Sequence, residues 1–202
     1  MKKNLVAIMA IGMLIFGLFG VAQAAPITFN DNFDTENSGV GILNYNKFQN
    51  WTVSDGTVDL IGNGYFEWFN KEHGLYVDMD GSTGNAGKIS TNLTPGNYSL
   101  SYSLAGSQRT GSQNDSVIVS LGNTTLINHN MAYNEGFQTY TTTFLVDSET
   151  TLSFEGLGND NMGLLLDNVV LSGTPTPVPA AVWLLGSGLA GLVALRRKKR
   201  DA

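Results

Sequence analysis

The chain has 202 residues, a length that fits one large domain better than several. Gly supplies 24 of these residues and charged residues make up only 14%, which argues against both a helical bundle and a disordered polyelectrolyte. Residues 25–177 hold four basic residues against 16 carboxylates, a net charge of −12, so they repel phosphate backbones and nucleic acid is excluded as a partner.

The first 24 residues are expected to be a cleaved secretory signal peptide. Two lysines precede an uncharged apolar run over residues 5–21, and residues 22–24 (Ala-Gln-Ala) then supply the small side chains that signal peptidase accepts. An N-terminal membrane anchor that is never cut is the alternative. Cleavage after Ala24 would leave a mature protein that starts at Ala25.

Hydrophobic and polar residues alternate over most of the chain that follows, which predicts strands with one buried face. Ten strands are predicted, over residues 27–33, 48–53, 57–61, 75–79, 88–93, 98–104, 117–121, 137–146, 151–154 and 164–171. No amphipathic stretch is long enough for a helix. Residues 25–173 are therefore predicted to form one all-β domain, a two-sheet antiparallel jelly-roll sandwich, with an immunoglobulin-like sandwich as the alternative.

Four short motifs lie in order along this domain: Asp31-Asn32-Phe33-Asp34, Asn50-Trp51-Thr52-Val53, Leu75-Tyr76-Val77-Asp78-Met79-Asp80-Gly81 and Leu165-Leu166-Asp167-Asn168-Val169. They resemble the galactose-binding-like jelly rolls, which include many carbohydrate-binding modules and a plant cell-wall domain family. The resemblance implies a structural calcium ion held by an acid near the first strand and an Asp in the last. Asp34 and Asp167 are the expected ligands, with Asp31 as a third. Alternatively, Asp34 caps a turn and Asp167 hydrogen-bonds its neighbours.

A competing cation loop begins at Asp78, because residues 78–82 (Asp-Met-Asp-Gly-Ser) follow the start of the EF-hand pattern. The sixth position of that loop is Thr83 rather than Gly, and the twelfth is Ile89 rather than Glu. The loop therefore fails the EF-hand template.

Four aromatic residues fall in five positions between Tyr65 and Phe69, more than one face of a strand can bury. Strand alternation would send Phe66 and Trp68 to one side and Tyr65 and Phe69 to the other. An exposed aromatic pair is typical of platforms that stack on sugar rings or dock a partner, so Tyr65, Trp68 and Phe69 are candidate ligand-binding residues. In the alternative arrangement both aromatic pairs are buried, one in the core and one under residues 37–47. Trp51 is expected in the core.

Arg109 stands alone among Gly, Ser and Gln residues and is either a polar contact to the ligand or a solvated turn residue. The plant family carries a Gln-Arg pair similar to Gln108-Arg109 after the corresponding strand. That resemblance favours a contact to the ligand.

Catalytic signals are weak along the chain. It has no cysteine, no G-x-S-x-G and no H-E-x-x-H, and its two histidines, His73 and His129, are expected on solvated loops. A pair of carboxylates for glycoside hydrolysis has no signature in sequence. The chain is expected to be non-enzymatic, with a small glycan hydrolase or lyase as the alternative and calcium as the one expected cofactor.

The C-terminus combines a Pro-rich segment, an apolar run and a basic cluster. Residues 174–179 are expected to form an extended linker and residues 180–195 one transmembrane helix. That helix would be about 24 Å long, short for a hydrocarbon core of about 30 Å. The basic tail, residues 196–202, would hold the C-terminus in the cytoplasm.

Residues 177–200 resemble the PEP-CTERM sorting signal of Gram-negative bacteria, on the positions Pro177, Val178, Pro179, Trp183, Arg196 and Arg197. Val178 stands where the commonest form of that signal has Glu. The resemblance implies processing by the membrane protease exosortase after passage through the inner membrane, with an ordinary membrane-anchored tail as the alternative. The chain is thus expected at the cell surface or in an exopolysaccharide matrix, either binding extracellular polysaccharide or serving as a structural component that binds no sugar.

Overall fold

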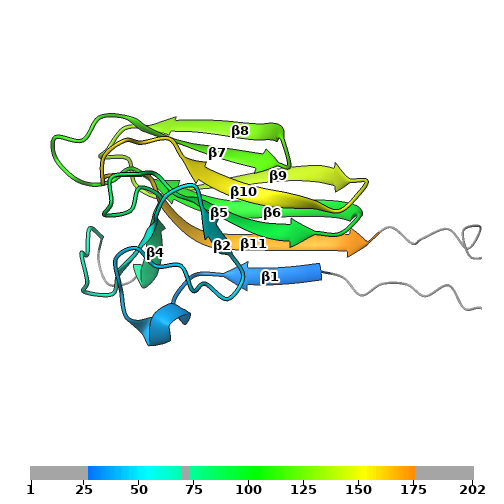
Figure 1. The fold of residues 1–202 in the computed structure, drawn as a ribbon, viewed down its shortest axis with the longest axis horizontal. Helices are drawn as coiled ribbons and strands as arrows, with labels where there is room; N and C mark the ends of the chain where they lie inside the picture. The colour runs from blue at the N-terminus through cyan, green and yellow to red at the C-terminus, as the bar shows by residue number, and fades with distance from the viewer. Residues whose placement is uncertain (1–26, 70–72, 176–202) are drawn as a thin grey trace, which may run out of the picture. The chain divides into compact units, whose positions relative to one another are not determined.

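Strands joined by loops make up the part of the chain that this computed structural model describes, residues 27–69 and 73–175 (Figure 1). These ranges contain β1 (Ile27–Asp31), a short 3-10 helix η1 (Glu36–Gly39), β2 (Thr52–Ser54), β3 (Asp59–Gly62), β4 (Leu75–Asp78), β5 (Lys88–Leu93), β6 (Gly96–Ala105), β7 (Asp115–Leu121), β8 (Thr124–Met131), β9 (Gln138–Val146), β10 (Thr150–Gly156) and β11 (Leu165–Pro175). They belong to one compact unit, Pro26–Pro175.

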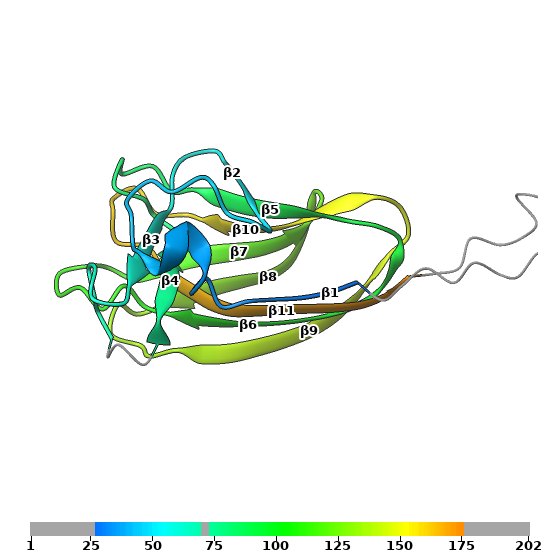
Figure 2. The ribbon, with the colours of Figure 1, turned by 90° about the horizontal axis from the view of Figure 1, so that it is seen from below.

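The strands form two facing sheets, which Figure 2 shows nearly edge-on. The first sheet has the order β3-β4-β11-β6-β9, with β1 paired to β11 beside β4, and the second has the order β2-β5-β10-β7-β8. The strand pairings within both sheets are antiparallel. The predicted all-β, two-sheet antiparallel jelly roll is therefore confirmed.

The main core lies between the sheets and follows the predicted alternation. In β6, Tyr98, Leu100, Tyr102 and Leu104 are buried, while the intervening serines lie on the other face. Trp51 is buried as expected, and its ring packs edge-on against Phe154. Each large apolar side chain removed from water contributes roughly 1.5–3 kcal/mol, so this layer is the main source of stability.

A second, smaller cluster covers the outer face of the first sheet near the start of β11. It contains the buried residues Ile61, Tyr76, Ala105 and Leu165, with Leu43, Phe69 and Phe137 packed against them. These side chains alternate with Leu75, Val77, Leu104 and Leu166 of the main core, so they point to the opposite face. The first sheet is therefore buried on both faces at this point.

Three features of the structure differ from the sequence predictions. The strand predicted over residues 48–53 is reduced to β2, because Phe48 packs into the core from a loop. The strand β8 was not predicted, because it lies at an edge of its sheet and buries only His129 and Met131. Residues 65–69 form an irregular loop rather than a strand.

The two ends of the sandwich differ in the segments they bring together. At one end, which we call the tail end, Ile27 at the start of β1 pairs with Gly173 near the end of β11. At the opposite end, Asp78 of β4 and Ala105 of β6 both pair with Leu165, the first residue of β11. We call this second end the loop end, since β4, β6 and β10 finish there and β7, β9 and β11 begin there (Figure 1).

The predicted signal peptide (1–24), transmembrane helix (180–195) and basic tail (196–202) lie outside the described residues, as do the sorting-motif positions Pro177, Val178, Pro179, Trp183, Arg196 and Arg197. Thr174 and Pro175 of the predicted linker continue β11. Within residues 27–69 and 73–175, we find no helix with the length and apolar character needed to cross a bilayer.

Candidate functional site

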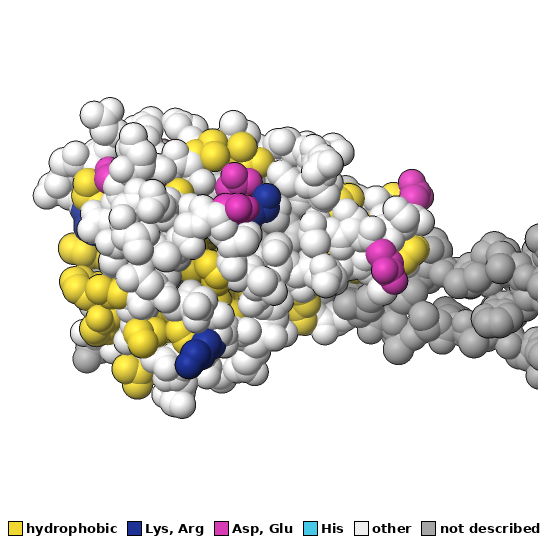
Figure 3. Space-filling view, in the orientation of Figure 1, with side chains coloured by type: hydrophobic (Ala, Val, Ile, Leu, Met, Phe, Trp, Pro, Cys, Tyr) yellow, Lys and Arg dark blue, Asp and Glu magenta, His cyan; other side chains and the backbone are white. Residues whose placement is uncertain are grey.

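Three aromatic side chains are exposed together near the loop end. Tyr65, Phe66 and Trp68 keep 37%, 52% and 38% of their surface accessible, and the rings of Tyr65 and Phe66 meet edge-on with centroids 4.9 Å apart. Figure 3 shows hydrophobic side chains gathered at this end of the molecule, around β4. Large apolar side chains grouped on a surface typically mark a site that binds something.

The loop that carries these rings is held by hydrogen bonds from its backbone N–H groups to the side chains of Glu67 and Tyr76. Glu67 accepts the N–H groups of Gly64 and Phe69, and the Tyr76 hydroxyl accepts the N–H of Trp68 at 2.9 Å. Phe66 has a positive φ of 46°, which breaks strand alternation. The expected division into two opposite pairs is therefore wrong, and so is the alternative in which both pairs are buried.

Phe69 has a different environment from the other three aromatic residues. It is partly buried in the second cluster, where its ring lies 5.9 Å from that of Tyr76 and 4.8 Å from that of Phe137. His73 lies against the same ring, with centroids 5.1 Å apart, and is exposed as expected. We therefore leave Phe69 out of the exposed aromatic group, which we define as Tyr65, Phe66 and Trp68.

The loop after β6 places Arg109 beside this aromatic group. Gln108 adopts a positive φ of 58°, and its side-chain amide donates to the carbonyls of Gly106, Tyr133 and Glu135. The side chain of the next residue, Arg109, extends toward Trp68. Its guanidinium carbon lies 5.6 Å from the centre of the Trp68 ring, within the range of a cation–π contact.

Arg109 also neutralises a buried carboxylate, that of Asp78. Its Nη2 donates to Asp78 Oδ2 at 2.9 Å and to the carbonyl of Asn161. Asp78 Oδ1 accepts the N–H groups of Asp80 and Gly163. Burial raises the pKa of the Asp78 carboxyl, and these donors together with the guanidinium oppose that rise. Arg109 is thus a fixed structural cation with one face toward Trp68, not a solvated turn residue.

The predicted metal ligands Asp31, Asp34 and Asp167 lie close enough to influence one another. Burial raises the pKa of Asp167 to about 7, and the negative charges of Asp34 and Asp31 add to the rise. Asp167 is 1% exposed, and its two oxygens accept only the N–H and the side-chain amide of Asn168. Among the described residues, none of the three takes part in an ion pair.

Two of these carboxylates also hold the surrounding backbone. Asp31 accepts the Phe33 N–H through Oδ1, and through Oδ2 it accepts both Trp51 Nε1 at 2.9 Å and Asn50 Nδ2 at 3.1 Å. Asp34 is exposed and accepts the N–H of Leu75 at 2.8 Å. The three carboxylates suit a hard cation in charge and in donor type, but their ligand oxygens do not all lie within 4.8 Å of one another.

His129 departs from its predicted place on a solvated loop. It lies in β8, is 7% exposed, and its Nε2 is 2.7 Å from the Tyr102 hydroxyl. Burial lowers the pKa of His129, because the charged imidazolium is poorly solvated there. Its role is to satisfy a buried tyrosine in the core.

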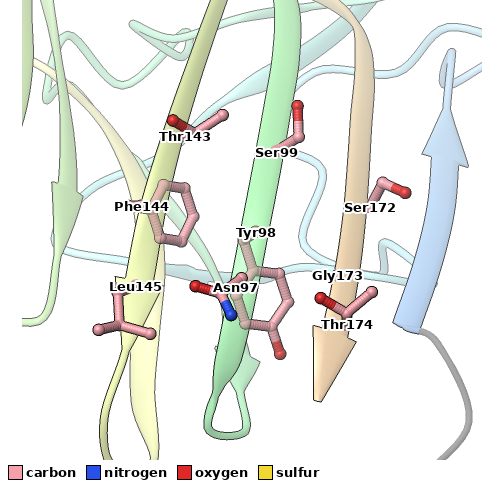
Figure 4. Close-up of a pocket in the computed structure, with 9 residues that line it drawn as sticks. All are labelled: Asn97, Tyr98, Ser99, Thr143, Phe144, Leu145, Ser172, Gly173 and Thr174. Atoms are coloured by element: carbon pink, nitrogen blue, oxygen red, sulfur yellow. The ribbon is translucent and has the colours of Figure 1, made fainter. Parts of the chain in front are cut away.

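A pocket of about 570 Å³ lies at the tail end, on strands β6, β9 and β11 (Figure 4). Tyr98 and Phe144 stack within it, with centroids 5.7 Å apart and planes 16° apart, beside Gly173. No charged side chain lines this pocket. Its polar side chains are uncharged Asn, Ser and Thr residues, whereas the surface around Trp68 carries the charge of Arg109.

Sequence reasoning missed two features of the loop-end surface. Phe66 was assigned to a strand face, and no local signal indicates the positive φ that exposes it. Asp78 was considered only as part of a cation loop. The sequence did hold one signal, because a domain with four basic residues and 16 carboxylates has few cations to pair with buried acids. Each basic residue, Arg109 included, was therefore a candidate partner of a buried carboxylate.

Comparisons with known proteins agree with the fold. No protein-family model and no curated protein sequence matches the chain. Among solved structures, the K3 cleaved adhesin domain of Lys-gingipain from Porphyromonas gingivalis is 14% identical, with a TM-score of 0.52 over 73% of this chain and 99% of that one. The K1 cleaved adhesin domain of the same protein is 13% identical, with a TM-score of 0.50 over 72% of this chain and 97% of that one.

A third similar structure is the CBM22-1 xylan-binding domain of Xyn10C from Paenibacillus barcinonensis. It is 13% identical, with a TM-score of 0.48 over 77% of this chain and 99% of that one. At such identities, the two adhesin domains establish a shared fold and say nothing about activity.

Proposed function

We propose that this chain is an exported, non-enzymatic surface protein whose loop end binds extracellular carbohydrate. The observation that carries the proposal is the exposed aromatic group, Tyr65, Phe66 and Trp68, beside the fixed cation of Arg109. Aromatic faces stack on the C–H faces of sugar rings, and a guanidinium offers several donors to hydroxyl groups. Two solved domains that share this fold carry the name adhesin, a role compatible with this proposal.

The charge of the domain favours a neutral glycan as the ligand. Residues 25–177 carry a net charge of −12, and Arg109 is one of only four basic residues among them. An acidic polysaccharide would meet a repulsive field on approach. We therefore expect uncharged hexose or pentose polymers to bind more tightly than uronic-acid polymers.

Polysaccharide binding is tested with the full chain in a mild detergent, which keeps the apolar ends in solution. Affinity electrophoresis against neutral and acidic polysaccharides is expected to show retardation that falls at least tenfold in Trp68→Ala, a change of about 1.4 kcal/mol. Leu145→Ala separates this surface from the tail-end pocket, because Leu145 is 52% exposed and lines that pocket on β9. Unchanged retardation in Trp68→Ala and Tyr65→Ala would overturn the proposal, and steady release of reducing ends would favour a hydrolase.

The export and sorting steps belong to the same proposal and rest on sequence. Signal peptidase would cut after Ala24, and exosortase would process the segment that contains Pro177, Pro179 and Trp183. The tail end and the loop end lie at opposite ends of the sandwich, so a chain held by its C-terminal segment would keep its aromatic group far from the attachment point. Mass spectrometry of the surface-released protein would locate both cuts, and an intact C-terminus would exclude exosortase processing.

A structural calcium ion at Asp31, Asp34 and Asp167 completes the proposal, and its binding would have to draw these carboxylates together, since their ligand oxygens do not all lie within 4.8 Å of one another. Asp34 and Asp167 would supply the outer and the buried carboxylate, and Asp31 a third oxygen donor. When bound, the ion would neutralise charges that no described basic side chain pairs with. It would also join the end of β1 to the middle of β11, because Asp31 pairs with Val169.

A further inference from the structure

A second group of three carboxylates lies at the loop end, formed by Asp80, Asp115 and Asp160. Asp80 follows β4, Asp115 begins β7, and Asp160 lies in the loop between β10 and β11. One ligand oxygen from each lies within 4.8 Å of the other two. Among the described residues, no other trio of acids or histidines is this close.

Asp80 is a buried carboxylate with no hydrogen-bond partner. Its exposed fraction is 0%, and neither of its side-chain oxygens accepts a hydrogen bond within the described residues. Glycine backbone surrounds it, since a Cβ added to Gly158 would overlap Asp80 Oδ2 and one added to Gly156 would come within 2.7 Å of Oδ1. The side chain is therefore held in a close-fitting cradle and aimed at Asp115 and Asp160.

This charge has no compensation from the protein. The described ion pairs are Lys88 with Glu155 and Arg109 with Asp78, and neither includes a member of the trio. An isolated buried charge is strongly unfavourable unless it is paired, protonated or bound to a metal. A cluster of three acids around one unpartnered carboxylate therefore requires either a proton held between two of them or a cation from outside.

We propose that Asp80, Asp115 and Asp160 bind a divalent cation of the calcium type. The donors are all oxygens, as a hard cation requires. Calcium–oxygen distances of about 2.3–2.6 Å allow two ligands of one ion to be up to about 5 Å apart, and the spacing within the trio meets that limit. Magnesium needs about 2.0–2.1 Å in a stricter octahedron, so we expect it to bind at least tenfold more weakly.

The ion would fix the loop that carries Asp160. The next residue in that loop, Asn161, accepts a hydrogen bond from Arg109 Nη2 through its carbonyl oxygen. Asp160 Oδ1 also accepts the N–H of Met162 at 2.8 Å. A cation at the trio would thereby join this loop to β4 and β7. It would also hold the Asn161 carbonyl in position to accept the hydrogen bond from Arg109, whether or not the loop end binds a sugar.

The test is calorimetric titration of the EDTA-treated full chain with CaCl2, for the wild type, Asp80→Asn and Asp160→Asn. Each variant is expected to lose one calcium site of the wild type. Asp147→Asn is the matched control, because Asp147 is an exposed acid in the turn between β9 and β10 and is expected to leave binding unchanged. Asp167→Asn separates this site from the one proposed on β11, and it should keep the site that Asp80→Asn removes.

Folding of the variants is checked by thermal unfolding in EDTA. Asp80→Asn removes an unpartnered buried charge, so it is expected to unfold at or above the wild-type temperature while no longer responding through this site to calcium. The proposal is overturned if both variants keep the wild-type stoichiometry and affinity. It is equally overturned if the wild type shows no saturable binding below about 10 mM Ca2+, beyond the range of extracellular calcium modules.

Discussion

Arg109 Nη2 donates a hydrogen bond to Asp78 Oδ2 at 2.9 Å and thereby joins two segments 31 residues apart. Asp78 continues β4 toward Asp80, and Arg109 reaches from the loop after β6 toward Trp68. One ion pair therefore supports both the exposed aromatic group and the cradle of the proposed cation site.

Arg109→Ala is expected to destabilise the fold by about 3–5 kcal/mol, because it leaves the charge of Asp78 buried and unpaired. Urea unfolding measures the change, with Lys47→Ala, at an exposed lysine, as the control. The double variant Asp78→Asn, Arg109→Met removes both charges and is expected to recover part of the loss. A loss below about 1 kcal/mol in Arg109→Ala would show that water or a proton already compensates Asp78.

Gly173→Ala is expected to lower the free energy of unfolding by about 1–3 kcal/mol, through overpacking. A Cβ at Gly173 would lie 2.6 Å from Cδ1 of Tyr98, whose ring is 3% exposed and stacked on Phe144. Gly136→Ala is the control, since a Cβ there would meet nothing within 4 Å. Equal stability of the two variants in urea would mean that Tyr98 does not lie over Gly173.

His129 is expected to make the fold less stable as the pH falls. Its pKa is lowered in the folded state by burial, whereas the unfolded residue takes up a proton near pH 6.5. The contribution is thus fully present above about pH 6.5 and is lost as the pH falls through the folded pKa.

Unfolding of the wild type and His129→Gln in EDTA at several pH values isolates this effect, because the two proteins share all their carboxylates. The stability of the wild type relative to the variant should decrease on acidification. His73→Gln, at an exposed position, should follow the wild type. A constant difference between wild type and His129→Gln would show that His129 is not held neutral by burial.

Asp167→Asn is expected to remove the calcium response of the site on β11. The measurement is best made in the Asp80→Asn background, where the proposed loop-end site no longer contributes. At a calcium concentration 100 times the Kd, the loss of one site removes about 2.7 kcal/mol of stabilisation. In EDTA the same substitution should be neutral or stabilising, because Asp167 is 1% exposed and its charge is unpaired. An unchanged calcium response would exclude Asp167 as a ligand.

Local pattern predicted much of this fold. The strand predicted over residues 88–93 matches β5, and the alternation of Tyr, Leu and Ser predicted which side of β6 is buried. Such predictions succeed because side-chain alternation is a property of the single strand. The edge strand β8 was missed for the same reason, since its polar residues leave little alternation to detect.

By itself, the sequence determined the all-β class, the buried place of Trp51 and a domain with far more acids than bases. Only the tertiary structure decided which of those acids meet. Asp78 and Arg109, or Asp80, Asp115 and Asp160, come together because loops from different strands end at one end of two packed sheets. No local pattern encodes such contacts, since they depend on the order of strands in space and on a positive φ at residues such as Gln108, which precedes Arg109.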